Sequence, residues 1–247
     1  MFSIFKKKIP ANYSDYFPIV TDIHSHILPG IDDGAPDVET SILLIEGLIN
    51  LGITQSVATP HIIGDLYRND AATINKALAL VTDALAKKQI DFKVTAAAEY
   101  MLDAYFLELL YSKTPLLTIK NNLLLTEFSY ADKPYNVEQL LFNIITEGYQ
   151  PILAHPERYG YYHNDFKQYN YLNEIGFVLQ VNLLSLTGYY GKPAARAANY
   201  IIKNNLASFV GTDLHHERHL NALSDNKNKT LFKEALKSKI FNEDMQF

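Results

Sequence analysis

Cysteine is absent from this sequence of 247 residues. Without cysteine the chain cannot form disulfide bonds, bind zinc through thiolates or use a cysteine nucleophile. The absence is also typical of proteins that work in the cytoplasm, which is the location we expect.

Basic charge and long apolar runs are also scarce. The formal net charge of −5 argues against a nucleic-acid-binding protein, which must neutralise phosphates. No stretch approaches the roughly 18 apolar residues of a membrane span, so we expect no transmembrane segment. The start, MFSIFKKKIP, places its charge after apolar residues, unlike a secretory signal. We expect residues 1–16 to be a tail, with Lys6–Lys8 either solvated or touching an anionic membrane surface.

What the chain does contain is an alternation of short apolar runs and longer amphipathic segments. Hydrophobic residues make up 48% of it, enough for a substantial core. The runs are rich in β-branched residues and predict seven strands. They cover 17–24, 53–59, 92–99, 122–128, 151–155, 177–182 and 208–213. Helices are expected over 37–52, 70–89, 136–147, 165–175, 193–204 and 228–238.

The alternation of strands and helices predicts βα units and a parallel sheet. Seven such strands favour a closed or nearly closed barrel in one domain, residues 17–247, with a doubly wound open sheet as the fallback. We expect helix 37–52 to be capped by Asp37 at its start and by Gly52 at its end.

Six of the seven predicted strands finish in, or run on to, side chains that commonly bind metal ions. Sites in parallel α/β folds lie at the carboxyl ends of strands, so these groups should meet at one mouth. Asp33, on the first βα loop, should reach the same place. The candidate ligands are His24, His26, Asp33, His61, Glu99, Glu127, His155, Asp213 and His215.

The pair His24 and His26 carries the clearest signal. Residues two apart on a strand point to the same face, so both imidazoles can bind one ion. The mixed nitrogen and oxygen donors suit Mn, Fe or Zn, and we expect Mn²⁺. Nine ligands are too many for one ion and predict two or three. Each residue alone has an ordinary alternative, such as a surface histidine or a charged strand terminus; their coincidence favours the metal site.

Arg158, three residues beyond His155, should overlook the metals. Its guanidinium can bind two phosphate oxygens at once, which makes it our catalytic and substrate-binding candidate. The alternative is a surface arginine paired with Glu157 or another acid. Arg196 is a weaker second source of positive charge for substrate binding.

Several motifs together resemble the PHP (polymerase and histidinol phosphatase) superfamily. They are DIHSHILPGIDDG, TPH, AAAE, LLTEF, LAHPERY and GTDLHH, which span most of the chain. Within the superfamily the chain is similar to bacterial metal-dependent protein-tyrosine phosphatases associated with capsule and exopolysaccharide synthesis.

This resemblance implies a distorted seven-stranded, TIM-like (β/α) barrel with a trinuclear site. The first ion would take His24, His26, Glu99 and Asp213. Glu99 would bridge to a second ion held also by Glu127 and His155, and a third would take Asp33, His61 and His215.

The activity implied is hydrolysis of phosphotyrosine, by in-line attack of a hydroxide that the metals generate. The implied partner is the tyrosine-rich tail of a bacterial tyrosine autokinase, which could also recruit the enzyme to a membrane. A homo-oligomer is left open. The closest alternative is a phosphoesterase acting on a small metabolite such as histidinol phosphate. An amidohydrolase or a metal-stabilised binding module without turnover fits the sequence less well.

Overall fold

The computed structural model describes residues 17–236 and 241–245, and within them nine short parallel strands form two sheets. The sheet orders are β1-β2-β4 and β3-β5-β6-β7-β8-β9. The predicted tail 1–16, including Lys6–Lys8, and the end of the last predicted helix lie outside the described residues. The strands are β1 Thr21–Ser25, β2 Gln55–Ala58, β3 His61–Ile62, β4 Lys93–Ala96, β5 Glu99–Met101, β6 Leu123–Glu127, β7 Gln150–Ala154, β8 Val178–Asn182 and β9 Ala207–Gly211.

The predicted count of seven strands is not confirmed, because the described residues hold two more. The second predicted strand, 53–59, corresponds to β2, and a separate strand, β3, begins after Pro60, which has no backbone N–H to donate to a ladder. The third breaks at the small residues Ala97 and Ala98. The chain stays in contact at both places, because Ala97 N donates to Ala58 O (2.8 Å) and Glu99 N donates to Pro60 O (3.1 Å).

The two sheets also meet between β9 and β1. Asp213 N donates to His24 O (2.8 Å), and His26 N donates to Leu214 O (2.9 Å). The α/β class and the parallel strand direction are therefore as predicted. The described strands are ordered into two hydrogen-bonded sheets rather than one continuous ring.

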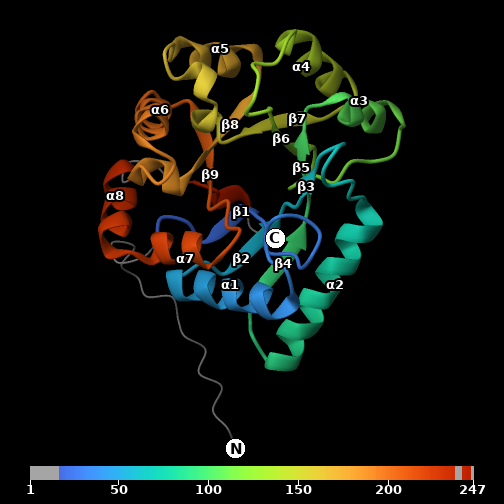
Figure 1. Ribbon diagram of the computed structural model, residues 1–247, viewed down its shortest axis with the longest axis vertical. Helices are drawn as coiled ribbons and strands as arrows, with labels where there is room; N and C mark the ends of the chain where they lie inside the picture. The colour runs from blue at the N-terminus through green and yellow to red at the C-terminus, as the bar shows by residue number, and fades with distance from the viewer. Residues whose placement is uncertain (1–16, 237–240, 246–247) are drawn as a thin grey trace, which may run out of the picture.

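Helices surround the strands (Figure 1). The first, α1, has both predicted caps: Asp37 accepts from Thr40 N at 2.7 Å, and Gly52 has a φ of 92°. Helices α3 and α7 were not expected from the sequence. The full set is α1 Val38–Leu51, α2 Ala71–Lys88, α3 Ala104–Tyr111, α4 Val137–Thr146, α5 Lys167–Ile175, α6 Lys192–Lys203, α7 Glu217–Ser224 and α8 Asn226–Leu236.

Apolar side chains pack on both faces of the strands. A large cluster joins the strands to the helices, and a smaller one centres on Ile23, Val57, Leu125 and Ile152. Strands buried on both sides are typical of parallel α/β folds, in which the strand ends are left to carry the site. No helix within the described residues is long and apolar enough to cross a membrane.

Candidate metal centre

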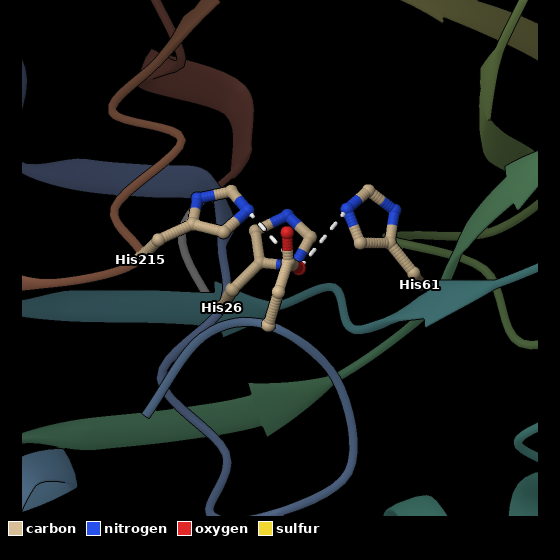
Figure 2. A group of neighbouring side chains, drawn as sticks. His26, His61 and His215 are labelled. Carbon is tan, nitrogen blue, oxygen red and sulfur yellow. Dashed lines mark ion pairs between the residues drawn. The ribbon is translucent and has the colours of Figure 1, made fainter. Parts of the chain in front are cut away.

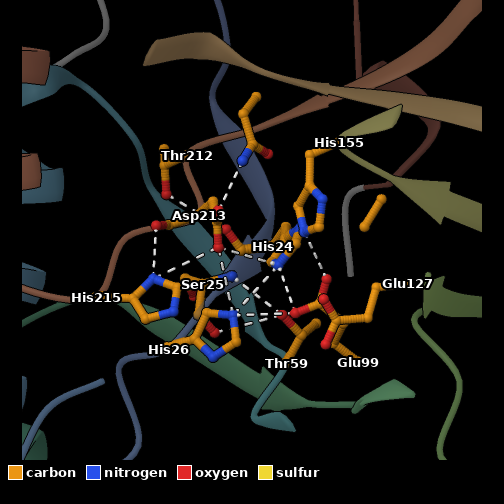
Figure 3. Close-up of polar contacts among 12 residues, drawn as sticks. His24, Ser25, His26, Thr59, Glu99, Glu127, His155, Thr212, Asp213 and His215 are labelled. Atoms are coloured by element: carbon orange, nitrogen blue, oxygen red, sulfur yellow. Dashed lines mark hydrogen bonds and ion pairs between the residues drawn. The ribbon is translucent and has the colours of Figure 1, made fainter. Parts of the chain in front are cut away.

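All nine predicted ligands lie together at one end of the strands, and Figure 3 labels all of them except Asp33 and His61. His24 lies in β1, Glu127 ends β6, and His155 follows β7 directly. His61 and Glu99 differ from the prediction in detail, because each begins a short strand, whereas His61 was expected after the second predicted strand and Glu99 at the end of the third. Their strands pair in register, so His61 lies beside Glu99. The nine residues form four overlapping groups with ligand atoms within 4.8 Å of one another.

The innermost group is a cage of four atoms: Nε2 of His24, Nε2 of His26, Oε2 of Glu99 and Oδ1 of Asp213. Five of its six edges measure 3.2 to 3.4 Å. Two imidazole nitrogens and two carboxylate oxygens are donors that divalent transition-metal ions commonly take in proteins. The cage therefore has the donor chemistry that a divalent cation requires.

A second group surrounds Glu99. Its Oε1 lies 2.9 Å from His155 Nε2. The ring Nδ1 of His61 lies 3.1 Å from Glu99 Oε2 and 3.0 Å from Glu127 Oε1. These last three atoms are buried without a hydrogen-bond partner. Buried polar atoms are nearly always satisfied, so three orphans facing one another fit a cation between them.

The third group is more open and faces the mouth. His61 Nε2 and His215 Nε2 lie 3.5 and 3.6 Å from Asp33 Oδ1, whose side chain is 54% exposed. Figure 2 shows the rings of His61 and His215 on either side of His26. The groups share residues: His26 belongs to this group and to the cage, and His61 offers one nitrogen here and the other to Glu99 and Glu127.

Hydrogen bonds behind the cluster select the nitrogen that each imidazole presents. Asp32 Oδ2 lies 2.8 Å from Nδ1 of His26, and the backbone oxygen of Asp213 lies 2.9 Å from Nδ1 of His215. Both rings therefore present Nε2, as metal-binding histidines commonly do when a carboxylate or carbonyl holds the other nitrogen. Sequence reasoning missed Asp32; the Asp32-Asp33 pair was a signal, but spacing alone does not say which carboxylate faces the imidazole.

Backbone conformation at the cluster is unusual. His155 has a φ of 35° and Asp213 a φ of 51°, both in the left-handed region that residues other than glycine seldom adopt. Such strain concentrates at functional sites, where the surroundings hold it in place. Gly34 is required for close packing, since a Cβ there would lie 2.0 Å from the backbone oxygen of His26.

The electrostatics of the cluster favour added positive charge. Burial opposes the charged form of His24, but Glu99 and Asp213 outweigh it and raise the pKa of His24 to about 9. Burial likewise opposes ionisation of those two carboxyls, yet the imidazolium of His24 beside them holds both pKa values well below the ordinary range. In the metal-free protein, protons balance the carboxylates; a bound cation would replace them.

Arg158 lies over this cluster and lines a cavity of about 230 Å³ together with His61, His155, Tyr130 and Tyr190. Its Nη1 donates to Asp213 Oδ2 at 2.7 Å. The guanidinium carbon lies 5.0 Å from the ring centre of Tyr130 and 4.2 Å from that of Tyr190. The arginine is thus held by a carboxylate and two aromatic faces beside the metal cluster.

The alternative for Arg158 was a pairing with Glu157 or another acid, and the acid that it contacts is Asp213, not Glu157. Glu157 is fully buried and accepts hydrogen bonds from the backbone N of Asn182 and from the Ser185 hydroxyl. Arg196 is exposed on α6 and is not among the residues that line the cavity, so the structure does not bring it to the cluster.

Comparison with known proteins gives a consistent result. A model of the family described as "Capsular polysaccharide synthesis, CpsB/CapC" matches residues 20–240. The tyrosine-protein phosphatase YwqE of Bacillus subtilis is 32% identical over 195 residues, which are 78% of this chain and 76% of that protein.

Two solved structures place the fold. One, from a study of YwqE from Bacillus subtilis and CpsB from Streptococcus pneumoniae described as metal-dependent tyrosine phosphatases, aligns with a TM-score of 0.75 and 28% identity, covering 90% of this chain and 96% of that one. A histidinol phosphate phosphatase from Lactococcus lactis aligns with a TM-score of 0.52 and 13% identity, covering 87% and 93%, which is a likeness of fold alone.

Proposed function

The chain belongs to the CpsB/CapC family of capsular polysaccharide synthesis proteins, and from that premise we propose that it is a metal-dependent protein-tyrosine phosphatase. The observation that carries the proposal is the convergence of nine imidazole and carboxylate side chains into overlapping groups with ligand spacing. Relatives that bear the name of tyrosine-protein phosphatase support the choice of substrate.

We propose that two or three ions occupy the cluster, with Mn²⁺ as the native metal and Fe or Zn as alternatives. The cage of His24, His26, Glu99 and Asp213 would hold the most buried ion. Glu99, Glu127 and His155 would hold a second, and Asp33, His61 and His215 a third. Bound ions would supply the charge that polarises a phosphoryl oxygen and lowers the pKa of a water molecule from about 15.7 towards 7.

The protein's own contribution at the cavity is Arg158. Nη1 is engaged by Asp213, which leaves the rest of the guanidinium to donate to phosphate oxygens and to stabilise the charge of the transition state. Tyr130 and Tyr190 hold the guanidinium plane and present aromatic surface at the mouth, which suits an aryl phosphate. The phenolate released has a pKa near 10, which makes it a tolerable leaving group.

We further propose that the substrate is a phosphotyrosine-bearing protein, in particular the tyrosine-rich tail of a bacterial tyrosine kinase that controls polysaccharide export. The family's link to capsule synthesis supports this partner. A cytoplasmic location, recruitment to the membrane by that partner and assembly into a homo-oligomer stay predictions.

The test compares turnover of a phosphotyrosine peptide with that of histidinol phosphate, with Mn²⁺ and with a chelator. We expect Mn²⁺-dependent release of phosphate from the peptide, at a kcat/KM at least about 100-fold above that for histidinol phosphate. Asp213→Asn should abolish turnover while the far-UV circular dichroism spectrum is retained. A preference for histidinol phosphate would favour the metabolite phosphatase, and activity that survives both the chelator and Asp213→Asn would refute the metal mechanism.

A further inference from the structure

The strand β8 supplies no candidate ligand, yet two of its residues, Gln180 and Asn182, contact two members of the innermost cage. Gln180 and Asn182 are both fully buried. Two amide side chains without solvent must find partners within the protein. Their partners are each other and two members of the cage, His24 and Asp213.

The four side chains form one chain of hydrogen bonds. Asn182 Nδ2 donates to Asp213 Oδ2 at 2.7 Å, and Gln180 Nε2 donates to Asn182 Oδ1 at 2.9 Å. Gln180 Oε1 lies 2.8 Å from Nδ1 of His24. The two amides therefore link Asp213 to His24 through three consecutive hydrogen bonds.

The direction of this chain is determined by its carboxylate end. The ionised Asp213 can only accept, so the NH₂ group of Asn182 must face it. The oxygen of Asn182 then requires the NH₂ group of Gln180, and the oxygen of Gln180 in turn requires a proton on Nδ1 of His24. The proton that His24 gives up to a cation is then the one on Nε2, the nitrogen that lies 3.2 to 3.3 Å from the cage atoms of Glu99 and Asp213.

We propose that Gln180 and Asn182 are positioning residues that fix the ring tautomer of His24 and the rotamer of Asp213, so that the cage is formed before any cation enters. Asp213 Oδ2 also accepts from Arg158, so the two donors occupy this oxygen and direct Oδ1 into the cage. The inference rests on the metal site of the proposed function and assigns a role to a strand that contributes no ligand.

The packing around these residues supports a site built for this contact. Gly211 of β9 lies against both partners: a Cβ there would be 2.8 Å from the Cβ of His24 and 2.9 Å from Nε2 of Gln180. Only glycine allows β9 to approach so closely, and the approach brings Asp213 within reach of Asn182.

The test is the affinity of the purified protein for Mn²⁺, measured by competition with a chelator, in Gln180→Leu and in a matched control. Gln55→Leu serves as the control, because Gln55 is also a buried glutamine on a parallel strand, β2, and its Nε2 donates to Thr21 Oγ1 at 2.7 Å, outside the cluster. Gln180→Met, closer in length, is a second variant should leucine prevent folding. Thermal unfolding of the metal-free proteins separates loss of stability from loss of the ligand geometry.

We expect Gln180→Leu or Gln180→Met to weaken Mn²⁺ binding about 10- to 100-fold, as the removal of a partner behind a metal ligand commonly does. Gln55→Leu should lower the unfolding temperature comparably and leave the affinity unchanged. Wild-type affinity in both Gln180 variants, or an equal loss in Gln55→Leu, would overturn the inference. A wild-type chain that binds no Mn²⁺ would overturn both this inference and the proposed function. A wild-type chain that binds Mn²⁺ but does not hydrolyse phosphotyrosine would overturn the proposed function alone.

Discussion

In the metal-free protein, raising the pH from 6.5 to about 9.5 should lower the free energy of unfolding by about 3 kcal/mol. The acids Glu99 and Asp213 hold a proton on buried His24 up to a pKa of about 9, against an ordinary 6.5. That difference, at about 1.4 kcal/mol per pH unit, gives the figure of about 3 kcal/mol.

The sign follows from which state holds the proton. The pKa of His24 is higher in the folded chain, so its stabilising contribution is complete below pH 6.5 and is lost as the pH rises through about 9. The pKa values of His26 and His61 are also raised, by acids around them and against the cost of burial, so they act in the same direction. The lowered pKa of His215, due mainly to burial, makes that residue neutral in the folded state throughout this range.

Divalent cations should cancel this loss. An ion in the cage replaces the proton, and a ligand at about 100 times its dissociation constant adds about 2.7 kcal/mol to the folded state. Urea unfolding followed by tyrosine fluorescence, at each pH in chelator and in Mn²⁺, measures the free energy of unfolding under both conditions. His24→Gln should reduce the loss of stability with pH in chelator, whereas His163→Gln, outside the cluster, should leave it unchanged. Equal losses with and without Mn²⁺, or no loss in chelator, would refute the reasoning.

Two further substitutions have matched controls. Arg158→Lys removes the planar fork that reaches Asp213 and phosphate, and should lower kcat on a phosphotyrosine peptide about 100-fold; Arg196→Ala should change it by less than about twofold. Equal kcat values for the two variants in steady-state kinetics would contradict the role assigned to Arg158. Gly34→Ala should cost about 2 kcal/mol or more, because the new Cβ meets the backbone of His26 at 2.0 Å. Gly160→Ala, where a Cβ meets nothing within 4 Å, should be close to neutral, and equal unfolding temperatures would count against the close approach.

The fold could be predicted to the level of class and element order, since the apolar runs and caps are local signals. Six helices appear within a few residues of their predicted bounds, and α1 has both of its predicted caps. Strand β3 was missed because it has only two residues, and the break at Ala97–Ala98 was missed because a short apolar run reads as one strand even where its pairing changes from one sheet to the other. Helix α7 was missed since its sequence, ERHLNALS, has few apolar residues to reveal a period.

The candidate site could be predicted as a set of residues because strand ends converge in parallel folds. What the sequence could not provide was the arrangement behind the ligands. Gln180 and Asn182 carry no charge, so nothing in their type marks them as partners of His24 and Asp213. Arg196 was selected for its charge alone, and the periodicity of α6 turns it outward.

The most direct test of the metal cluster is a crystal structure of the protein grown with Mn²⁺, with anomalous diffraction used to locate the ions. We expect two or three anomalous peaks among the nine side chains, one of them about 2.0 to 2.2 Å from His24 Nε2, His26 Nε2 and Asp213 Oδ1. Peaks only at the protein surface, or none between these residues at saturating Mn²⁺, would contradict this expectation.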